Sequence, residues 1–153
     1  MDLQTYFLNE GQCQIPADWR DESLNIFRIP ASAAAGEASL VISRDYGQGT
    51  GRFDDFIQQQ LHQCQHTLPE FKLLQKQICS EPFSYAWVDY TWQARERCIM
   101  LRQLFFESRP ANIIVSLTTT PEDAAAHEAA FRAMVRSVQL KHVVNAPQAR
   151  MFG

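Results

Sequence analysis

The chain has 153 residues, of which 46% are hydrophobic and 20% charged, a composition typical of one folded domain with a sizeable core. Fourteen basic and seventeen acidic side chains give a formal net charge of −3, so the chain lacks the excess of positive charge that binds nucleic acid or anionic membranes. The opening residues, MDLQTYFLNE, lack the basic and apolar regions of a secretory signal, and no apolar run approaches the ~20 residues of a membrane span. We therefore expect a cytoplasmic protein that binds no nucleic acid and is not stably inserted in a membrane.

The first half of the chain is predicted to form strands followed by one helix. Short runs of branched and aromatic residues between turn signals predict strands at residues 4–8, 12–15, 24–29 and 38–46. The first two of these flank the turn signal Asn9-Glu10-Gly11 and are expected to form a small hairpin. After the glycine-rich segment GQGTG, apolar residues recur every three or four positions from Phe53 to Leu68. This period predicts an amphipathic helix that ends at Pro69.

The second half is predicted to form a β-meander and a second helix. Runs rich in aromatic and branched residues predict strands at 71–80, 84–94, 98–108 and 111–120. Because their connections have only two or three residues, these strands must be antiparallel neighbours. The segment Thr120-Pro121-Glu122-Asp123 combines an N-cap residue with proline at the first helical position, which predicts a helix from there to about Leu140.

This order of elements predicts an α+β fold with a mainly antiparallel sheet flanked by two main helices. We expect residues 1–140 to form a single domain. Residues 141–153 show no hydrophobic period and are expected to form a flexible tail.

The sequence contains no established catalytic motif. It has no GxSxG, HExxH, Walker loop or GxGxxG after a strand. His62 and His66 share a face of the predicted helix at a spacing that zinc ligands often use, but no third ligand is near, and we interpret the pair as part of a solvated face. Asp89 and Glu96 could form an acid pair, although charges that keep a hairpin soluble are the simpler interpretation. We expect no enzyme activity, no cofactor and no metal.

Several predicted strands carry large apolar residues on both faces, which needs explaining. Strict alternation places Leu24 and Ile26 on one face of their strand and Phe27 and Ile29 on the other. Either helices cover both faces of the sheet, or part of one face is an exposed apolar groove for a partner.

Two glutamines lie among these apolar residues. Gln60 lies beside the apolar stripe of the first helix, and Gln103 lies between Leu101 and Phe105 on one strand face. A neutral amide in such a place can pair with polar groups of a guest without the cost of burying a charge. Alternatively, both amides lie at the edge of the core.

The block from Ser23 to Gly49, SLNIFRIPASAAAGEASLVISRDYGQG, resembles the Eag-type chaperones of bacterial type VI secretion, within the DcrB-like family. Four later segments, LPEFKLL, WVDYTWQ, IMLRQLFFESRPANII and LTTTPEDAAAHEAAF, extend the resemblance over roughly residues 6–140. The resemblance implies a Mog1/PsbP-like fold and a homodimer that holds the N-terminal transmembrane helices of a type VI effector in the cytoplasm. Such effectors carry a PAAR domain and are loaded onto the VgrG spike.

The alternation of side chains along each strand identifies the candidate groove residues. Leu24, Ile26 and Val41 are the best candidates, because the opposite faces hold Phe27 with Ile29 and Leu40 with Ile42. Leu68 is a candidate for the rim, and Gln60 and Gln103 could bond polar points on the guest. The alternative interpretation assigns these residues to an ordinary core. The alternative functions are a Mog1-type regulatory module that binds a soluble partner, and an enzyme or small-ligand carrier.

Overall fold

The computed structural model describes residues 1–47, 51–81 and 83–141. Eight strands lie within these residues: β1 (Leu3–Phe7), β2 (Gln12–Pro16), β3 (Asn25–Ile29), β4 (Ala38–Asp45), β5 (Lys72–Cys79), β6 (Tyr85–Ala94), β7 (Arg97–Phe106) and β8 (Asn112–Thr119). The helices described are α1 (Phe53–Thr67), the 3₁₀ helix η1 (Ala124–His127) and α2 (Glu128–Ser137). The predicted α+β fold class is confirmed. Most of the expected tail, residues 142–153, lies outside the described residues, as do residues 48–50 of the glycine-rich segment.

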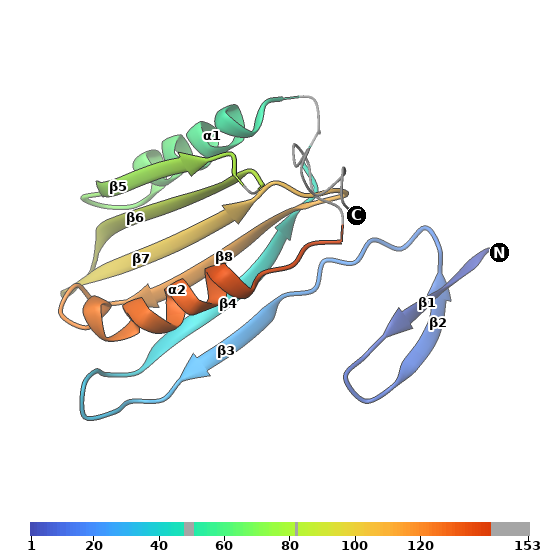
Figure 1. Ribbon diagram of the computed structural model, residues 1–153, viewed down its shortest axis with the longest axis horizontal. Helices are drawn as coiled ribbons and strands as arrows, with labels where there is room; N and C mark the ends of the chain where they lie inside the picture. Colours follow the sequence, from blue (N-terminus) through green and yellow to red (C-terminus); the bar gives the residue numbers. More distant parts are fainter. Residues whose placement is uncertain (48–50, 82, 142–153) are drawn as a thin grey trace.

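Six of the strands form one antiparallel sheet in the order β3-β4-β8-β7-β6-β5 (Figure 1). The predicted meander is therefore confirmed, since β5, β6, β7 and β8 are successive neighbours. Strand β4 joins the free side of β8, and β3 extends the sheet to its edge. The sheet consequently has two edge strands, β3 and β5.

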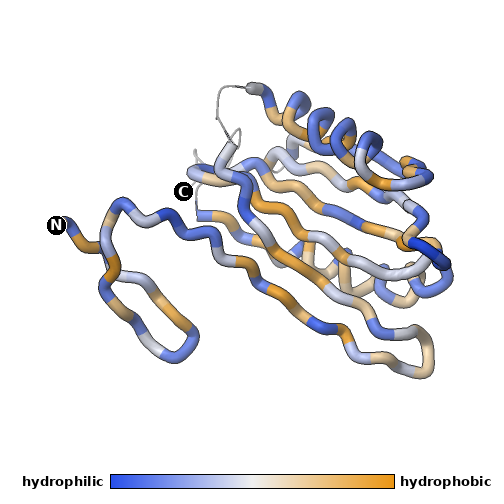
Figure 2. Tube along the Cα trace, turned by 180° about the vertical axis from the view of Figure 1, so that it is seen from behind, coloured by the Kyte–Doolittle hydropathy of each residue, from blue (hydrophilic) through white to orange (hydrophobic). Residues whose placement is uncertain are grey.

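The two helices pack against opposite faces of this sheet (Figures 1 and 2). Phe131 of α2 packs against residues such as Trp87 and Leu117, whereas Phe53 and Ile57 of α1 pack in the cluster on the other side. Alternation along the strands explains this separation, because neighbouring residues of one strand point to opposite faces. We call the two surfaces the α1 face and the α2 face.

The predicted start of the second helix is wrong. Residues Thr120–Asp123 form a turn, closed by a bond of 3.1 Å from the Asp123 amide to the Thr120 carbonyl, and α2 begins only at Glu128. The Asp123 carboxylate, expected in the first turn of the helix, instead accepts a hydrogen bond of 3.0 Å from the distant Gly36 amide, and η1 separates the turn from α2. A residue engaged in this tertiary contact no longer serves the local helix.

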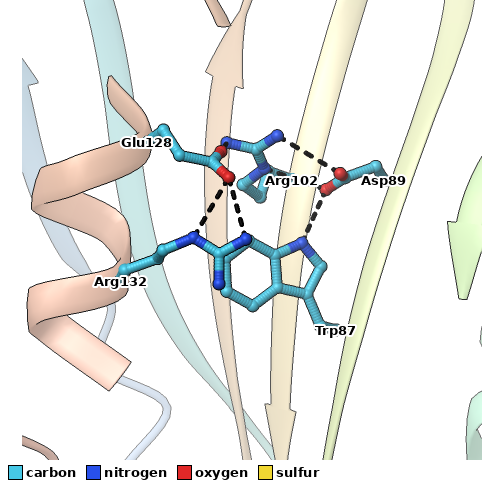
Figure 3. A network of polar contacts seen from close by, with 5 residues as sticks. All are labelled: Trp87, Asp89, Arg102, Glu128 and Arg132. Carbon is cyan, nitrogen blue, oxygen red and sulfur yellow. Dashed lines mark hydrogen bonds and ion pairs between the residues drawn. The ribbon is translucent and has the colours of Figure 1, made fainter. Parts of the chain in front are cut away.

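A network of charged side chains ties α2 to the sheet (Figure 3). Asp89 on β6 accepts two hydrogen bonds from the Arg102 guanidinium, at 3.0 and 3.2 Å, and a third from the Trp87 indole at 3.0 Å. Arg102 also pairs with Glu128, which in turn pairs with Arg132 one turn along α2 at 3.0 Å. Interpreting Asp89 as a solvated charge at a hairpin end is therefore wrong, since Asp89 is only 4% exposed.

The β1–β2 hairpin is predicted correctly, but it lies apart from the six-stranded sheet (Figure 1). Two side-chain bonds tie it to the next segment: the Tyr6 hydroxyl lies 2.9 Å from the Ser23 hydroxyl, and the Gln4 amide donates to the Trp19 carbonyl at 3.2 Å. Phe7 in the hairpin and Trp19 after it are 72% and 62% exposed. Exposed apolar side chains that gather in one patch often mark an interaction site. Among the described helices, none is long and apolar enough to cross a membrane.

Candidate partner-binding face

Helix α1 covers only the part of the α1 face that lies over β6 and β7. Its apolar cluster includes side chains of β6 and β7 such as Val88, Tyr90 and Phe105. No described helix lies over β3 and β4 on this side of the sheet (Figure 2). The uncovered area consists of the side chains of β3, β4 and β8 that point to this face, together with Gln103 of β7. We call this area the open face. Its members are Ile26, Arg28, Ser39, Val41, Ser43, Gln103, Ser116 and Thr118.

One row of directly paired residues crosses the open face. Ile26 on β3 is opposite Val41 on β4, Val41 is opposite Ser116 on β8, and Ser116 is opposite Gln103 on β7. Neighbouring strands are about 4.8 Å apart, so the row is roughly 14 Å long. Three of the predicted site residues thus share one row, although 77 positions separate Ile26 from Gln103 in the sequence.

The side chains of this row are accessible and partly polar. Ile26 is 67% exposed, and Val41, Ser116 and Gln103 are half-buried. The Gln103 amide donates a hydrogen bond of 2.8 Å to the Ser116 hydroxyl, which fixes the orientation of the glutamine. The row therefore offers aliphatic surface at the sheet edge and an oriented amide beside α1.

Most of the remaining side chains of the open face are short. Ser39 and Thr118 form the neighbouring row on one side, and Ser43 lies in the row on the other side. Serine and threonine side chains leave room for another backbone to approach closely, and their hydroxyls can bond polar groups of that backbone. Alternation along the strand places Ser39 and Ser43 on the face of Val41 from the sequence alone. Ser116 and Thr118 were missed, and they join this face once the register of β4 with β8 is known.

Arg28 supplies the one basic side chain of the open face. It pairs with Glu37 at 3.4 Å, and both side chains are largely exposed. Such a pair contributes little to stability because water screens it. The face therefore carries little net charge, which suits an apolar or neutral partner.

The remaining predicted site residues flank the open face. Leu24 immediately precedes β3 and is 55% exposed. Gln60 is half-buried on α1, which borders the open face. Leu68 is the residue directly after α1 and packs, partly buried, against the apolar cluster under that helix. Of the residues predicted on the opposite face, Ile29, Leu40 and Ile42 pack on the α2 face, whereas Phe27 is 55% exposed.

The covered side of the α1 face is a well-packed apolar core. Tyr90 is buried there, and burial raises the pKa of its hydroxyl, whose oxygen lies 3.6 Å from the Cys64 sulfur. The phenol therefore stays neutral in the folded protein at any physiological pH.

The model of the DcrB family matches residues 10–137 of this chain. The chain belongs to the DcrB family. Effector EagT6 of Pseudomonas aeruginosa is 44% identical over 137 residues, which cover 89% of this chain and 95% of that protein. The resemblance to the Eag-type proteins that the sequence motifs indicated is thus confirmed.

Two solved structures are similar to this chain. The crystal structure of PA94 from P. aeruginosa, a protein of unknown function, matches with a TM-score of 0.81 and 42% identity, over 90% of this chain and 96% of that chain. The solution structure of PsbP from Synechocystis matches with a TM-score of 0.47 and 13% identity, over 88% of this chain and 90% of that chain.

Proposed function

We propose that this protein is a cytosolic chaperone and adaptor in type VI secretion. In this proposal it binds the N-terminal transmembrane helices of a PAAR-containing effector and shields them until the effector is loaded onto the VgrG spike. The observation that carries the proposal is the uncovered row with Ile26 and Val41, on a chain that is 44% identical to Effector EagT6. The protein would act by binding alone, without catalysis or a cofactor.

The size of the open face fits one α-helix. The face spans the distance from β3 to β7, three gaps of about 4.8 Å. An α-helix with its side chains is about 10–12 Å wide. A membrane helix in water would aggregate or insert into the wrong membrane, because its apolar surface is costly to hydrate. Each square ångström that the face removes from water would contribute roughly 25 cal/mol to binding.

The polar side chains of the face suit a guest that must later be released. Gln103 and the serine hydroxyls are neutral, so burying them costs less than burying a charge, and they can bond polar points of the guest. Gln60 would do the same from the helix that borders the face. Leu24 would add apolar surface next to Ile26 at the start of β3, and Leu68 would form the rim at the end of α1.

We further propose that the protein is a homodimer whose hairpin is covered by the second copy. Support comes from the exposed apolar side chains Leu3, Phe7, Leu8 and Trp19, which the sheet of the same chain leaves uncovered. A dimer would also place two open faces in one particle, so a guest with two apolar helices could be held at both faces.

Co-expression with the N-terminal region of an effector encoded by a neighbouring gene tests the chaperone function. We expect a soluble complex of fixed stoichiometry in native mass spectrometry, and we expect loss of that complex when the guest's apolar helices are deleted. A guest that stays insoluble, or that binds through its soluble domain alone, would contradict the proposal.

The second candidate is a Mog1-type regulatory module that binds a soluble partner. The observation that favours it is the polar share of the open face, where Ser39, Ser43, Ser116 and Thr118 outnumber the aliphatic side chains. Deleting the guest's apolar helices separates the two functions, because a regulatory module would keep its partner after that deletion.

A further inference from the structure

The exposed side of α1 carries a pair of histidines in contact with each other. His62 and His66 are four residues apart, both are exposed, and their Nε2 atoms lie 3.0 Å apart. Their ring centroids are 4.3 Å apart, with an angle of 77° between the ring planes. Two ring nitrogens at this distance share one proton in a hydrogen bond, so the lone pair of one points toward the N–H of the other.

The same separation fits two ligands of one metal ion. Bonds from a transition metal to histidine nitrogen are about 2.0–2.1 Å long. Two such ligands at the 90° angle of an octahedral or square-planar ion are therefore roughly 3.0 Å apart, and at a tetrahedral angle roughly 3.4 Å apart. The distance of 3.0 Å between the Nε2 atoms matches the first geometry.

We propose that His62 and His66 form a two-ligand site for a borderline divalent transition metal, of the kind represented by Ni²⁺ and Cu²⁺. Imidazole suits these ions, and both favour octahedral or tetragonal geometry. For the metal to bind, the proton between the two rings moves to Nδ1 of its own imidazole, and both exposed rings turn so that the two Nε2 lone pairs converge on the ion. This proposal replaces the interpretation of the pair as merely a solvated face.

Water completes the coordination in this proposal. Within the part of the chain that the structure describes, no group of three or more His, Cys, Asp or Glu side chains could hold a metal. The site is therefore weaker than a structural zinc site, and the metal exchanges readily with solution. A metal bound across this turn would link the last two turns of α1, the helix that also carries Gln60, and would oppose fraying of its C-terminal end.

Isothermal titration of the untagged protein with Ni²⁺ alone tests the site. We expect one Ni²⁺ per chain, and binding at least tenfold weaker in either His62→Gln or His66→Gln. His142→Gln is the matched control, because it removes a histidine outside the pair and should leave binding within twofold of the wild type. Unchanged binding in both variants of the pair, or loss of binding in His142→Gln, would overturn the proposal.

A second readout guards against loss of folding. Because both histidines are exposed, we expect each variant to keep the far-ultraviolet circular dichroism of the wild type. Ni²⁺ should raise the melting temperature of the wild type and of His142→Gln, and chelation with EDTA should reverse the rise. An equal rise in His62→Gln would contradict a site on this pair.

Discussion

The neighbouring residues Ile26 and Phe27 provide a matched test of which face binds the guest. They lie on the same edge strand and point to opposite faces of the sheet, Ile26 to the open face and Phe27 to the α2 face. Their exposed fractions are similar, 67% and 55%. Replacing each with alanine removes apolar surface at nearly the same place, and only Ile26→Ala should weaken binding of the guest.

The exposed fraction gives the size of the effect. Fully burying an isoleucine side chain contributes about 1.5–3 kcal/mol. Since 67% of Ile26 is still exposed in the free protein, covering it with a guest would contribute about two-thirds of that, roughly 1–2 kcal/mol. A change of about 1.4 kcal/mol is tenfold in affinity, so Ile26→Ala should raise the Kd about five- to thirtyfold.

Relative affinity can be measured by co-expressing the wild type and a variant with a limiting amount of guest and determining their ratio in the soluble complex, so that the guest helix is never free in water. Phe27→Ala should change the Kd by less than about twofold, and both variants should lose less than about 1 kcal/mol of unfolding free energy because both side chains are exposed. If Phe27→Ala weakens binding as much as Ile26→Ala, the assignment of the open face is wrong.

Further predictions concern the ion network, the buried phenol and the hairpin. Arg102→Met should lower the unfolding free energy in urea by about 3–5 kcal/mol because it leaves Asp89 buried without its cation, whereas Arg28→Met, at an exposed pair, should cost below about 1 kcal/mol; equal costs would refute this reading. Burial raises the folded pKa of Tyr90 above its unfolded value near 10, so stability present below pH 10 should be lost as the pH rises, by about 1.4 kcal/mol at pH 11 compared with pH 8. Urea unfolding of Tyr90→Phe should lack that part of the alkaline loss, and an identical profile would contradict the prediction. Phe7→Asp should convert the proposed dimer to a monomer in light scattering with unchanged circular dichroism, and a persistent dimer would show that the hairpin is not at the interface.

Most elements could be predicted because local patterns determine them. The apolar period from Phe53 onward predicts α1 to within one residue of its observed end at Thr67. Short connections require antiparallel neighbours, which accounts for the meander of β5 to β8. The turn at Thr120–Asp123 was not predictable in this way, because the hydrogen bond from the distant Gly36 amide to the Asp123 carboxylate depends on tertiary packing.

The candidate site was only partly predictable for a similar reason. Alternation correctly separates Ile26 from Phe27, yet it does not show which helix covers which face. The buried role of Asp89 depends on register: a hairpin that pairs Ala94 with Arg97 places Asp89 directly opposite Arg102. The position of the tight turn between β6 and β7 sets this register, so the turn could have predicted that ion pair. The open face itself follows from the packing of α1 against β6 and β7, which local patterns do not specify.

The most direct test of the open face is site-specific photo-crosslinking to the bound guest. A benzophenone side chain replaces Arg28, exposed on the open face, or Arg136, exposed on α2 at the opposite face. After co-expression and irradiation, we predict that only the probe at position 28 forms a crosslink, and that mass spectrometry maps it to an apolar helix of the guest. Crosslinks from position 136 alone, or crosslinks confined to a soluble domain of the guest, would contradict the claim that the open face shelters transmembrane helices.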